Sequence, residues 1–165
     1  MISDFCNSIE HKEREYISTE LRTALIEVNN GYFHISESEE NLIWFYKYRK
    51  QPYYKGLVDV LLRMKQAFNG KIRHVDELLS IEIDISLKFA IHYGKFSRQK
   101  TNVNNKLCGE TVAETYSLMK IGYAQSSSYV LFSNSFLGVI EDYQYNITEN
   151  KSIIPEIGTI HHLET

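Results

Sequence analysis

The sequence predicts an α+β domain in which helices pack on one face of an antiparallel sheet. Segments with helical periodicity alternate with short segments of strand character in the order β-α-β-β-α-β-α-β. The 165 residues contain no repeat, low-complexity tract or break in composition, and this length fits one domain with a sizeable core. We therefore interpret residues 1–165 as a single domain.

The first third of the chain predicts a strand, a helix and a hairpin. Ile2 to Phe5 are expected to form a short strand, and Ser8 is placed to cap the helix that follows. This helix is expected from about Glu10 to Asn29, because its apolar residues recur at the spacing of one buried face and Asn29-Asn-Gly31 ends it. Strands are expected at 32–38 and 42–48, joined by a polar turn at 39–41.

The rest of the chain predicts two more helices and three more strands. A helix is expected after Pro52, running to about Phe68, where Asn69-Gly70 stops it. Apolar and polar residues alternate from Ile85 to His92, which predicts a strand that is apolar on one face only. The other elements are expected as a polar loop or hairpin arm at 95–106, a helix at 110–121, and strands at 128–133 and 158–163, with 141–156 unassigned.

Composition and charge argue against several kinds of partner. The net charge is -3 and the basic residues are scattered, so neither nucleic acid nor a membrane surface is expected as a partner. Apolar runs fall short of the roughly 20 residues of a spanning helix and no signal peptide is recognised, so we expect a cytoplasmic protein. Cys6 and Cys108 lack a metal-type spacing, and we expect idle thiols.

Two motifs in the centre of the chain carry a family resemblance. Phe89-Ala-Ile-His-Tyr-Gly94 is followed by Gly109-Glu-Thr-Val-Ala-Glu-Thr-Tyr-Ser-Leu118, and then by a strand that ends in Ser133. This series resembles the signature of the class III nucleotide cyclase homology domain, in which a strand ends in IHxG and GDTVNxAxRL opens a helix. The hairpin at 35–47 resembles a subgroup of uncharacterised cyclase-like proteins. The resemblance implies a ferredoxin-like, nucleotide cyclase-like fold.

The resemblance also implies that most catalytic positions are substituted. Working members of the family hold two divalent metals with two aspartates; the first matches Asp4, whereas the second matches the uncharged Asn41. The Asn and Arg that stabilise the transition state fall on Ala113 and Ser117, which cannot donate to phosphate as a guanidinium does. Losing one oriented donor typically lowers the rate about a hundredfold, so essentially no cyclase activity is expected. Asp4 is then either a remnant metal ligand or a helix cap.

The positions that would read the base are changed as well. The Lys and Asp of adenylate-type members fall on Glu37 and Lys106, so the two charges are exchanged. Residues that meet the same purine ring lie close together, and we predict that Glu37 and Lys106 form an ion pair that closes the floor of the former nucleotide pocket. The alternative is two unrelated surface charges. We expect His92 to be a hydrogen-bonded structural residue rather than a ligand-binding one.

Three functional hypotheses follow from the resemblance. The first is a catalytically degenerate cyclase-like domain that acts as a binding or regulatory module without a cofactor, paired as a homodimer or with a cyclase-like partner. The second is a divergent nucleotide cyclase, or another phosphoryl-transfer enzyme, that uses Asp4 with Mg²⁺ or Mn²⁺. The third is a small-molecule sensor that uses the former nucleotide cleft.

Overall fold

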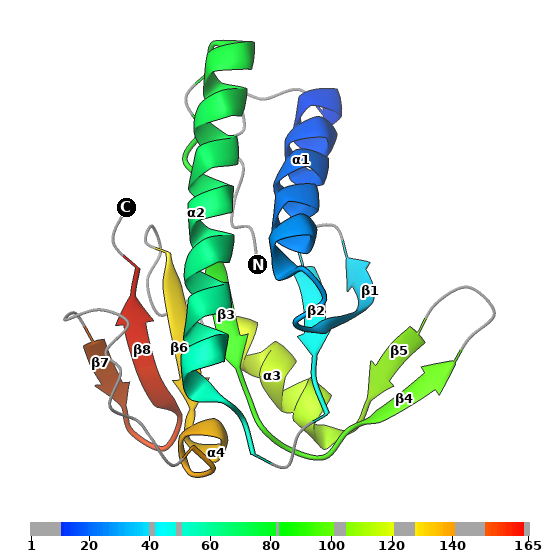
Figure 1. Cartoon of the computed structure of the whole chain (residues 1–165), viewed down its shortest axis with the longest axis vertical. Coiled ribbons are helices and arrows are strands. Elements are labelled where there is room, and N and C mark those ends of the chain that lie inside the picture. Colours follow the sequence, from blue (N-terminus) through cyan, green and yellow to red (C-terminus); the bar gives the residue numbers. More distant parts are fainter. Residues whose placement is uncertain are drawn as a thin grey trace.

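The computed structural model of this chain describes residues 11–39, 42–48, 51–81, 83–100, 105–120, 128–140 and 151–163. The strand predicted at Ile2–Phe5 lies outside these residues. In chain order (Figure 1) the described elements are α1 (His11–Asn29), β1 (His34–Glu39), β2 (Leu42–Tyr46), α2 (Tyr54–Leu79), β3 (Lys88–Ile91), β4 (Ser97–Lys100), β5 (Asn105–Cys108), α3 (Glu110–Lys120), β6 (Tyr129–Ser133), α4 (Asn134–Leu137), β7 (Lys151–Ile154) and β8 (Gly158–His162).

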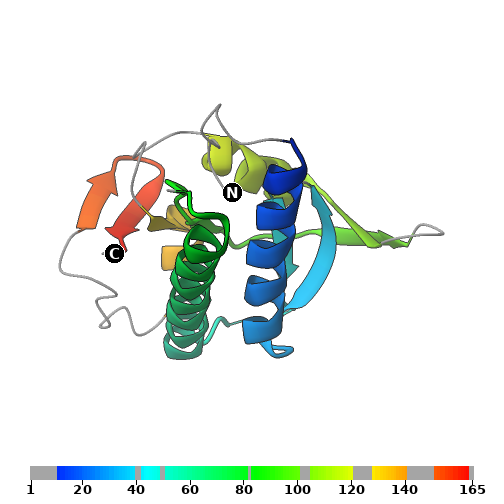
Figure 2. The same cartoon turned by 90° about the horizontal axis from the view of Figure 1, so that it is seen from above.

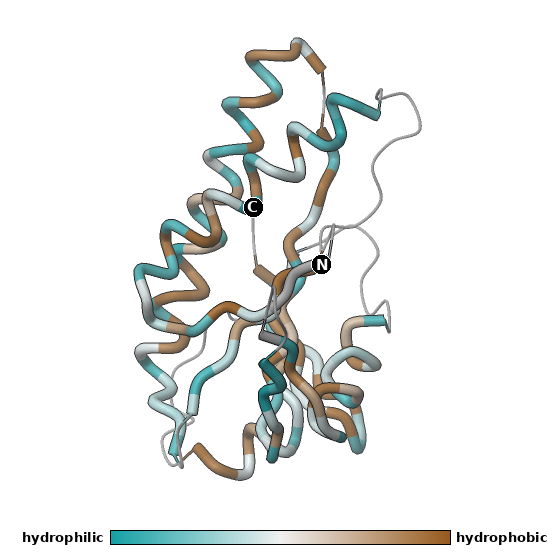
Figure 3. The backbone as a smooth tube through the Cα atoms, turned by 90° about the vertical axis from the view of Figure 1, so that its right-hand side faces the viewer, coloured by the Kyte–Doolittle hydropathy of each residue, from teal (hydrophilic) through white to brown (hydrophobic). Residues whose placement is uncertain are grey.

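The two long helices, α1 and α2, lie side by side and run antiparallel (Figure 1). Each has an apolar stripe, visible as alternating bands of brown and teal in Figure 3, and the two stripes meet in one core cluster. Ile17 and Leu21 of α1 are fully buried there with Phe68 of α2. At the surface, Lys71 Nζ lies 2.8 Å from a carboxylate oxygen of Glu20. No helix in the described ranges has the length and apolar character needed to cross a membrane.

Helix α2 is longer than the sequence predicts. The prediction that Asn69-Gly70 stops it is wrong, because the helix continues through this pair to Leu79. The apolar stripe also continues, since Ile72 and Val75 pack into the same cluster as Phe68. The helix ends at Ser80, which adopts a left-handed conformation with φ 52°. Burial of the apolar face therefore outweighs the weak helix propensity of the Asn-Gly pair.

The central sheet has four strands in the order β3-β6-β8-β7, and the hairpins β1-β2 and β4-β5 form separate ladders. β3 and β6 are parallel, whereas the other described pairs are antiparallel. The prediction of an antiparallel sheet is therefore wrong for the pair β3 and β6. Two parallel neighbours need a long crossover between them, and residues 92–128, which link these strands and include the β4-β5 hairpin and α3, are long enough to provide it.

The helices lie on both faces of this sheet, which corrects the expectation of helices on one face. Val130 and Phe132 of β6 pack in a cluster with residues of α2, whereas Tyr129 and Leu131 point the other way and pack with Leu118 of α3. Figure 2 shows α3 on the side of the sheet opposite α1 and α2. Because β6 is buried at every position, it needs cover on both faces.

Strands β2 and β3 are edge strands of different sheets, and residues of both line one cavity of about 240 Å³. A ferredoxin-like β-α-β-β-α-β unit places its first strand between these two positions. The sequence predicts that strand at Ile2–Phe5, outside the described residues, so the ferredoxin-like strand order stays a prediction.

Candidate functional site

The two central motifs meet where β3 leads into the β4-β5 hairpin and α3 begins. The Thr111 hydroxyl donates a hydrogen bond of 2.8 Å to the backbone carbonyl of Lys95. The same side chain lies against Gly94, where an added Cβ would collide with it. Gly109 has φ +129°, a backbone conformation that side chains rarely adopt, and its carbonyl accepts the first hydrogen bonds of α3. The two glycines therefore allow the close approach of the motifs.

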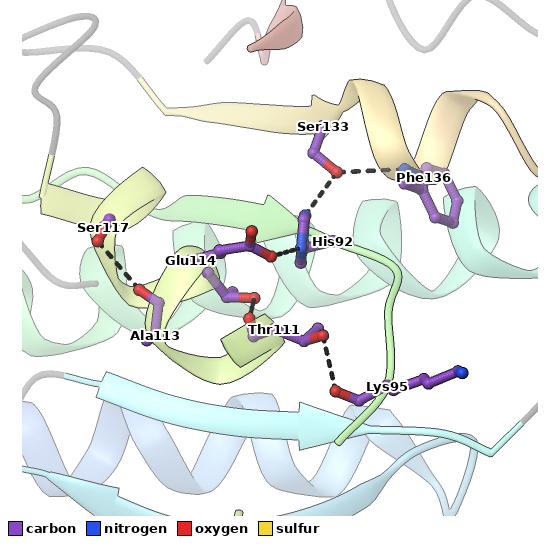
Figure 4. A network of polar contacts seen from close by, with 9 residues as sticks. His92, Lys95, Thr111, Ala113, Glu114, Ser117, Ser133 and Phe136 are labelled. Atoms are coloured by element: carbon purple, nitrogen blue, oxygen red, sulfur yellow. Dashed lines mark hydrogen bonds and ion pairs between the residues drawn. The ribbon is translucent and has the colours of Figure 1, made fainter. Parts of the chain in front are cut away.

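His92 lies at the centre of a polar cluster that joins β3, β6 and α3 (Figure 4). Its Nδ1 is 2.9 Å from Oγ of Ser133, and its Nε2 is 2.8 Å from a carboxylate oxygen of Glu114. The His92 side chain is 7% exposed, whereas that of Glu114 is 51% exposed. The prediction that His92 is hydrogen-bonded is confirmed, and the identity of its partners is new.

A hydroxyl, an imidazole and a carboxylate in this order are the groups that activate a serine nucleophile. Here, however, Ser133 is 3% exposed, and its Oγ accepts a hydrogen bond of 3.2 Å from the backbone N–H of Phe136. Ser133 is thus the N-cap of α4, and its oxygen faces that helix rather than solvent (Figure 4). A carboxylate only accepts, so Nε2–H is the donor to Glu114, and in a neutral ring Nδ1 then accepts from the Ser133 hydroxyl. We interpret the cluster as a structural tie.

The two positions that the family resemblance assigns to the transition state lie exposed on α3. Ala113 offers a methyl group, and the Ser117 hydroxyl donates a hydrogen bond of 3.0 Å to the Ala113 carbonyl within the same helix (Figure 4). Glu114 lies between them in the sequence and exposes half of its side chain. This part of α3 therefore presents a carboxylate and no side-chain cation at the positions where phosphate binding requires donors.

Of the other predicted site residues, the structure describes Lys106 and the backbone of Glu37. Asp4, Asn41 and the side chain of Glu37 lie outside the described residues. Lys106 is exposed on β5, which packs beside β1, the strand that carries Glu37. The two elements are therefore neighbours, and the ion pair between these residues stays a prediction. In the ranges that the structure describes, no group of three or more His, Cys, Asp and Glu side chains is placed to hold a metal ion.

The cavity between β2 and β3 is lined mainly by apolar and aromatic side chains from α1, α2, α3 and both strands. Its charged lining residues are Arg22, Lys47 and Lys88, and no carboxylate is among the lining residues that the structure describes. The ammonium group of Lys47 lies 3.3 Å from the centroid of the Tyr32 ring. A ferredoxin-like strand order would put the predicted first strand between β2 and β3 as well, so we assign no ligand to this cavity.

Sequence reasoning missed two features of this region. Ser133 and Glu114 are 41 and 22 residues from His92, and no local pattern indicates that their side chains meet. The second feature is a cluster of positive charge. Residues 92–109 hold four Lys and Arg residues and no Asp or Glu; Arg98, Lys100 and Lys106 lie on β4 and β5, and Lys95 comes just before β4. Counting charge in a window of this length would have found the cluster, which corrects the view that the basic residues are scattered.

Comparisons with known proteins place the fold and the family. The structure is similar to one titled "Crystal structure of the guanylyl cyclase Cya2", with a TM-score of 0.64 and 12% sequence identity over 94% of this chain and 82% of that chain. At this identity the likeness shows the fold alone, which is cyclase-like. No curated protein matches the chain. Residues 18–129, more than half of the chain, match the family described as "Protein of unknown function (DUF2652)". The chain therefore belongs to this family.

Proposed function

We propose that this chain is a cyclase-related domain that has lost catalysis and acts by binding, as a regulatory module that pairs with a second copy or with a cyclase-like partner. The observation that carries the proposal is the exposed part of α3. Ala113 and Ser117 stand where the resemblance places the transition-state Asn and Arg, and the Ser117 hydroxyl is bonded to its own helix. A transferring phosphoryl group needs cations and oriented donors, and the side chain of Glu114 adds negative charge instead.

An assay of the purified chain with ATP or GTP and Mn²⁺ tests the loss of catalysis. We expect no cyclic nucleotide above a control without protein. The variant Asp4→Ala is the matched control, because Asp4 is the one family metal position that keeps its carboxylate. Cyclic nucleotide that forms with the natural chain and disappears with Asp4→Ala would overturn the proposal in favour of a metal-dependent enzyme. Product that survives this change would point to a contaminant.

Binding is tested separately from catalysis. Light scattering at several protein concentrations measures the mass of the chain alone, and we expect a mass that rises towards a dimer. Isothermal titration with ATP and GTP measures whether a purine site remains. Tight nucleotide binding without turnover would identify a nucleotide sensor, whereas a monomer that binds neither nucleotide leaves only a cyclase-like partner and contradicts pairing with a second copy.

A further inference from the structure

The chain contains two Asn-Gly pairs, Asn30-Gly31 and Asn69-Gly70. Such a pair can modify itself, because the backbone nitrogen of the glycine attacks the amide carbon of the asparagine side chain. Glycine has no Cβ that would hinder this approach. The attack closes a five-membered ring, which requires the backbone between the two residues to rotate. Whether a pair reacts in the folded chain therefore depends on what holds its backbone.

The pair Asn69-Gly70 is held by helix α2, which continues on both sides of it. In an α-helix each interior N–H is bonded to the carbonyl four residues earlier, so the Gly70 nitrogen is already occupied. This turn is also anchored in the core, because Phe68 is fully buried and Ile72 packs in the same cluster. Ring closure at this pair therefore requires the middle of α2 to open first.

The pair Asn30-Gly31 lies in the turn between α1 and β1, outside both elements (Figure 1). Both residues are exposed, and both have a positive φ, 42° for Asn30 and 72° for Gly31. The Asn30 N–H donates to the Glu27 carbonyl at 3.1 Å, and the Tyr32 N–H donates to the Asn29 carbonyl at 2.8 Å. Among the described residues, no backbone carbonyl accepts the Gly31 N–H. An added Cβ at Gly31 meets no atom within 4 Å, so a ring has room to form.

The adjacent Asn29 has the opposite surroundings. It is 3% exposed, and its side chain makes two hydrogen bonds to the backbone of Phe33. Its Nδ2 donates to the Phe33 carbonyl, and its Oδ1 accepts from the Phe33 N–H, both at 2.9 Å. These two bonds connect the last residue of α1 to the residue before β1. They hold the Asn29 amide in place and leave Asn30 as the reactive asparagine of this turn.

We propose that Asn30 is the site at which the folded chain deamidates spontaneously, and that this change weakens the connection between α1 and β1. Hydroxide removes the Gly31 N–H proton, the nitrogen bonds to Cγ of Asn30, and the bond from Cγ to Nδ2 breaks. Nδ2 takes a proton from water and leaves as ammonia. Water then opens the succinimide ring at one of its two carbonyls, which leaves aspartate or isoaspartate. The reaction requires no oxidant or reductant.

Both products fit this turn less well than asparagine does. The new carboxylate at position 30 directly follows the C-terminus of α1, where the helix dipole disfavours negative charge. The last turn of α1 contains no basic residue, and Glu27 lies three residues before the new charge and repels it. Isoaspartate also adds one carbon to the backbone between Asn30 and Gly31. The extra length displaces Phe33 from the side chain of Asn29, which it must meet to form both hydrogen bonds.

The test follows both pairs in the same full chain, folded and in denaturing urea. Samples incubated at pH 7 and at pH 9 are digested with trypsin, and fragment masses locate each conversion of an amide to an acid. A sample taken at the start corrects for conversion during digestion. In the folded chain we expect Asn30 to react about tenfold or more faster than Asn69, because α2 must open before Asn69 reacts. In urea the two rates should converge, and at Asn30 the rate should be higher at pH 9.

The variant Asn30→Gly is the matched control, because glycine tolerates the positive φ and has no amide to lose. An isoaspartyl methyltransferase with a labelled methyl donor should label the incubated natural chain much more than the incubated variant. Urea unfolding measures the effect on the connection between α1 and β1. The urea midpoint of the natural chain should fall as the modified fraction rises, whereas that of the variant should not change during incubation.

Two results would overturn the assignment of the site. They are a folded chain in which Asn30 reacts no faster than Asn69, and a folded chain in which Asn30 stays intact while the unfolded chain reacts there. A fully modified chain with an unchanged urea midpoint would overturn the effect on the connection between α1 and β1. These rates depend neither on pairing nor on catalysis, so their outcome is independent of the proposed function.

Discussion

Gly94 lies directly against the side chain of Thr111, so the residue that ends one motif and a residue near the start of the next share a contact. Thr111 is fixed there by its hydrogen bond to the Lys95 carbonyl. Position 94 requires a glycine because a Cβ atom there would collide with the Thr111 side chain, and not because the backbone has a positive φ. The pairing of the two motifs in the sequence therefore reflects a packing constraint at the start of α3.

We expect Gly94→Ala to destabilise the protein by about 1–3 kcal/mol, the usual range for overpacking. In the double variant Gly94→Ala/Thr111→Ala the collision is removed, so the loss should be smaller than the sum of the two single losses. Urea unfolding of the four proteins in this cycle measures the coupling. Additive losses would contradict the contact, and Thr111→Ala alone gives the contribution of the bond to Lys95.

Two glycines in α2 provide a matched pair for helix stability. An added Cβ at Gly70 meets no atom within 4 Å, whereas at Gly56 it would lie 2.6 Å from the Tyr53 ring. We expect Gly70→Ala to stabilise the protein by about 1 kcal/mol, because alanine favours the helix interior. Gly56→Ala should gain less or lose stability, since the Tyr53 ring must move. Denaturant unfolding measures both, and a loss at position 70 would contradict a continuous α2.

The same residues explain what the sequence can and cannot predict. The buried stripe of α1 through Ile17 and Leu21 is a local periodic pattern, and the structure confirms it. Asn69-Gly70 predicts a helix stop because it is a local signal, but the burial of Val75 beyond it depends on α1 and outweighs that signal. The cover of β6 on both faces and the meeting of His92 with Ser133 depend on contacts between distant segments. Local patterns carry no information about such contacts.

The polar cluster around His92 should be a structural feature. Ser133→Ala removes the N-cap of α4 and a partner of His92, so we expect a loss of about 1–2 kcal/mol in the free energy of unfolding. Glu114→Gln should have a small effect, because that side chain is half exposed and an amide oxygen still accepts from Nε2. A fluorophosphonate probe, which reacts with activated serine side chains, tests the alternative that this cluster is catalytic. Labelling of Ser133, lost in Ser133→Ala, would identify an activated nucleophile.

His161 should make the stability depend on pH. It is fully buried on β8 against the ring of Phe132, and burial lowers its pKa from the usual 6.5, with smaller contributions from Lys151 and His162. The unfolded chain therefore binds a proton more readily than the folded one. The contribution of the neutral His161 to the free energy of unfolding should be fully present above about pH 6.5. It should be lost as the pH falls from there through the lower pKa of the folded state.

Urea unfolding at pH 7.5 and pH 5.5 measures this dependence. His161→Phe removes the titrating group and keeps a ring in contact with Phe132, so the difference between the two pH values should shrink. His162→Gln is the control, because this neighbour on the same strand is less buried. An unchanged pH dependence in His161→Phe would assign the effect to other groups.

The last prediction concerns Glu37 and Lys106, whose strands β1 and β5 lie beside each other. If the two charges form a pair, the reversals Glu37→Lys and Lys106→Glu should each lower stability by up to about 1 kcal/mol, and the double reversal should restore it because the pair is then exchanged. Unrelated surface charges would give additive effects instead. The pair would also occupy the place where the cyclases that this chain resembles bind the base, so ATP should bind weakly to the natural chain and more tightly to Glu37→Lys, which introduces the lysine found in those cyclases. Tight ATP binding that Glu37→Lys leaves unchanged would refute the closed pocket, even where the stability cycle supports the pair.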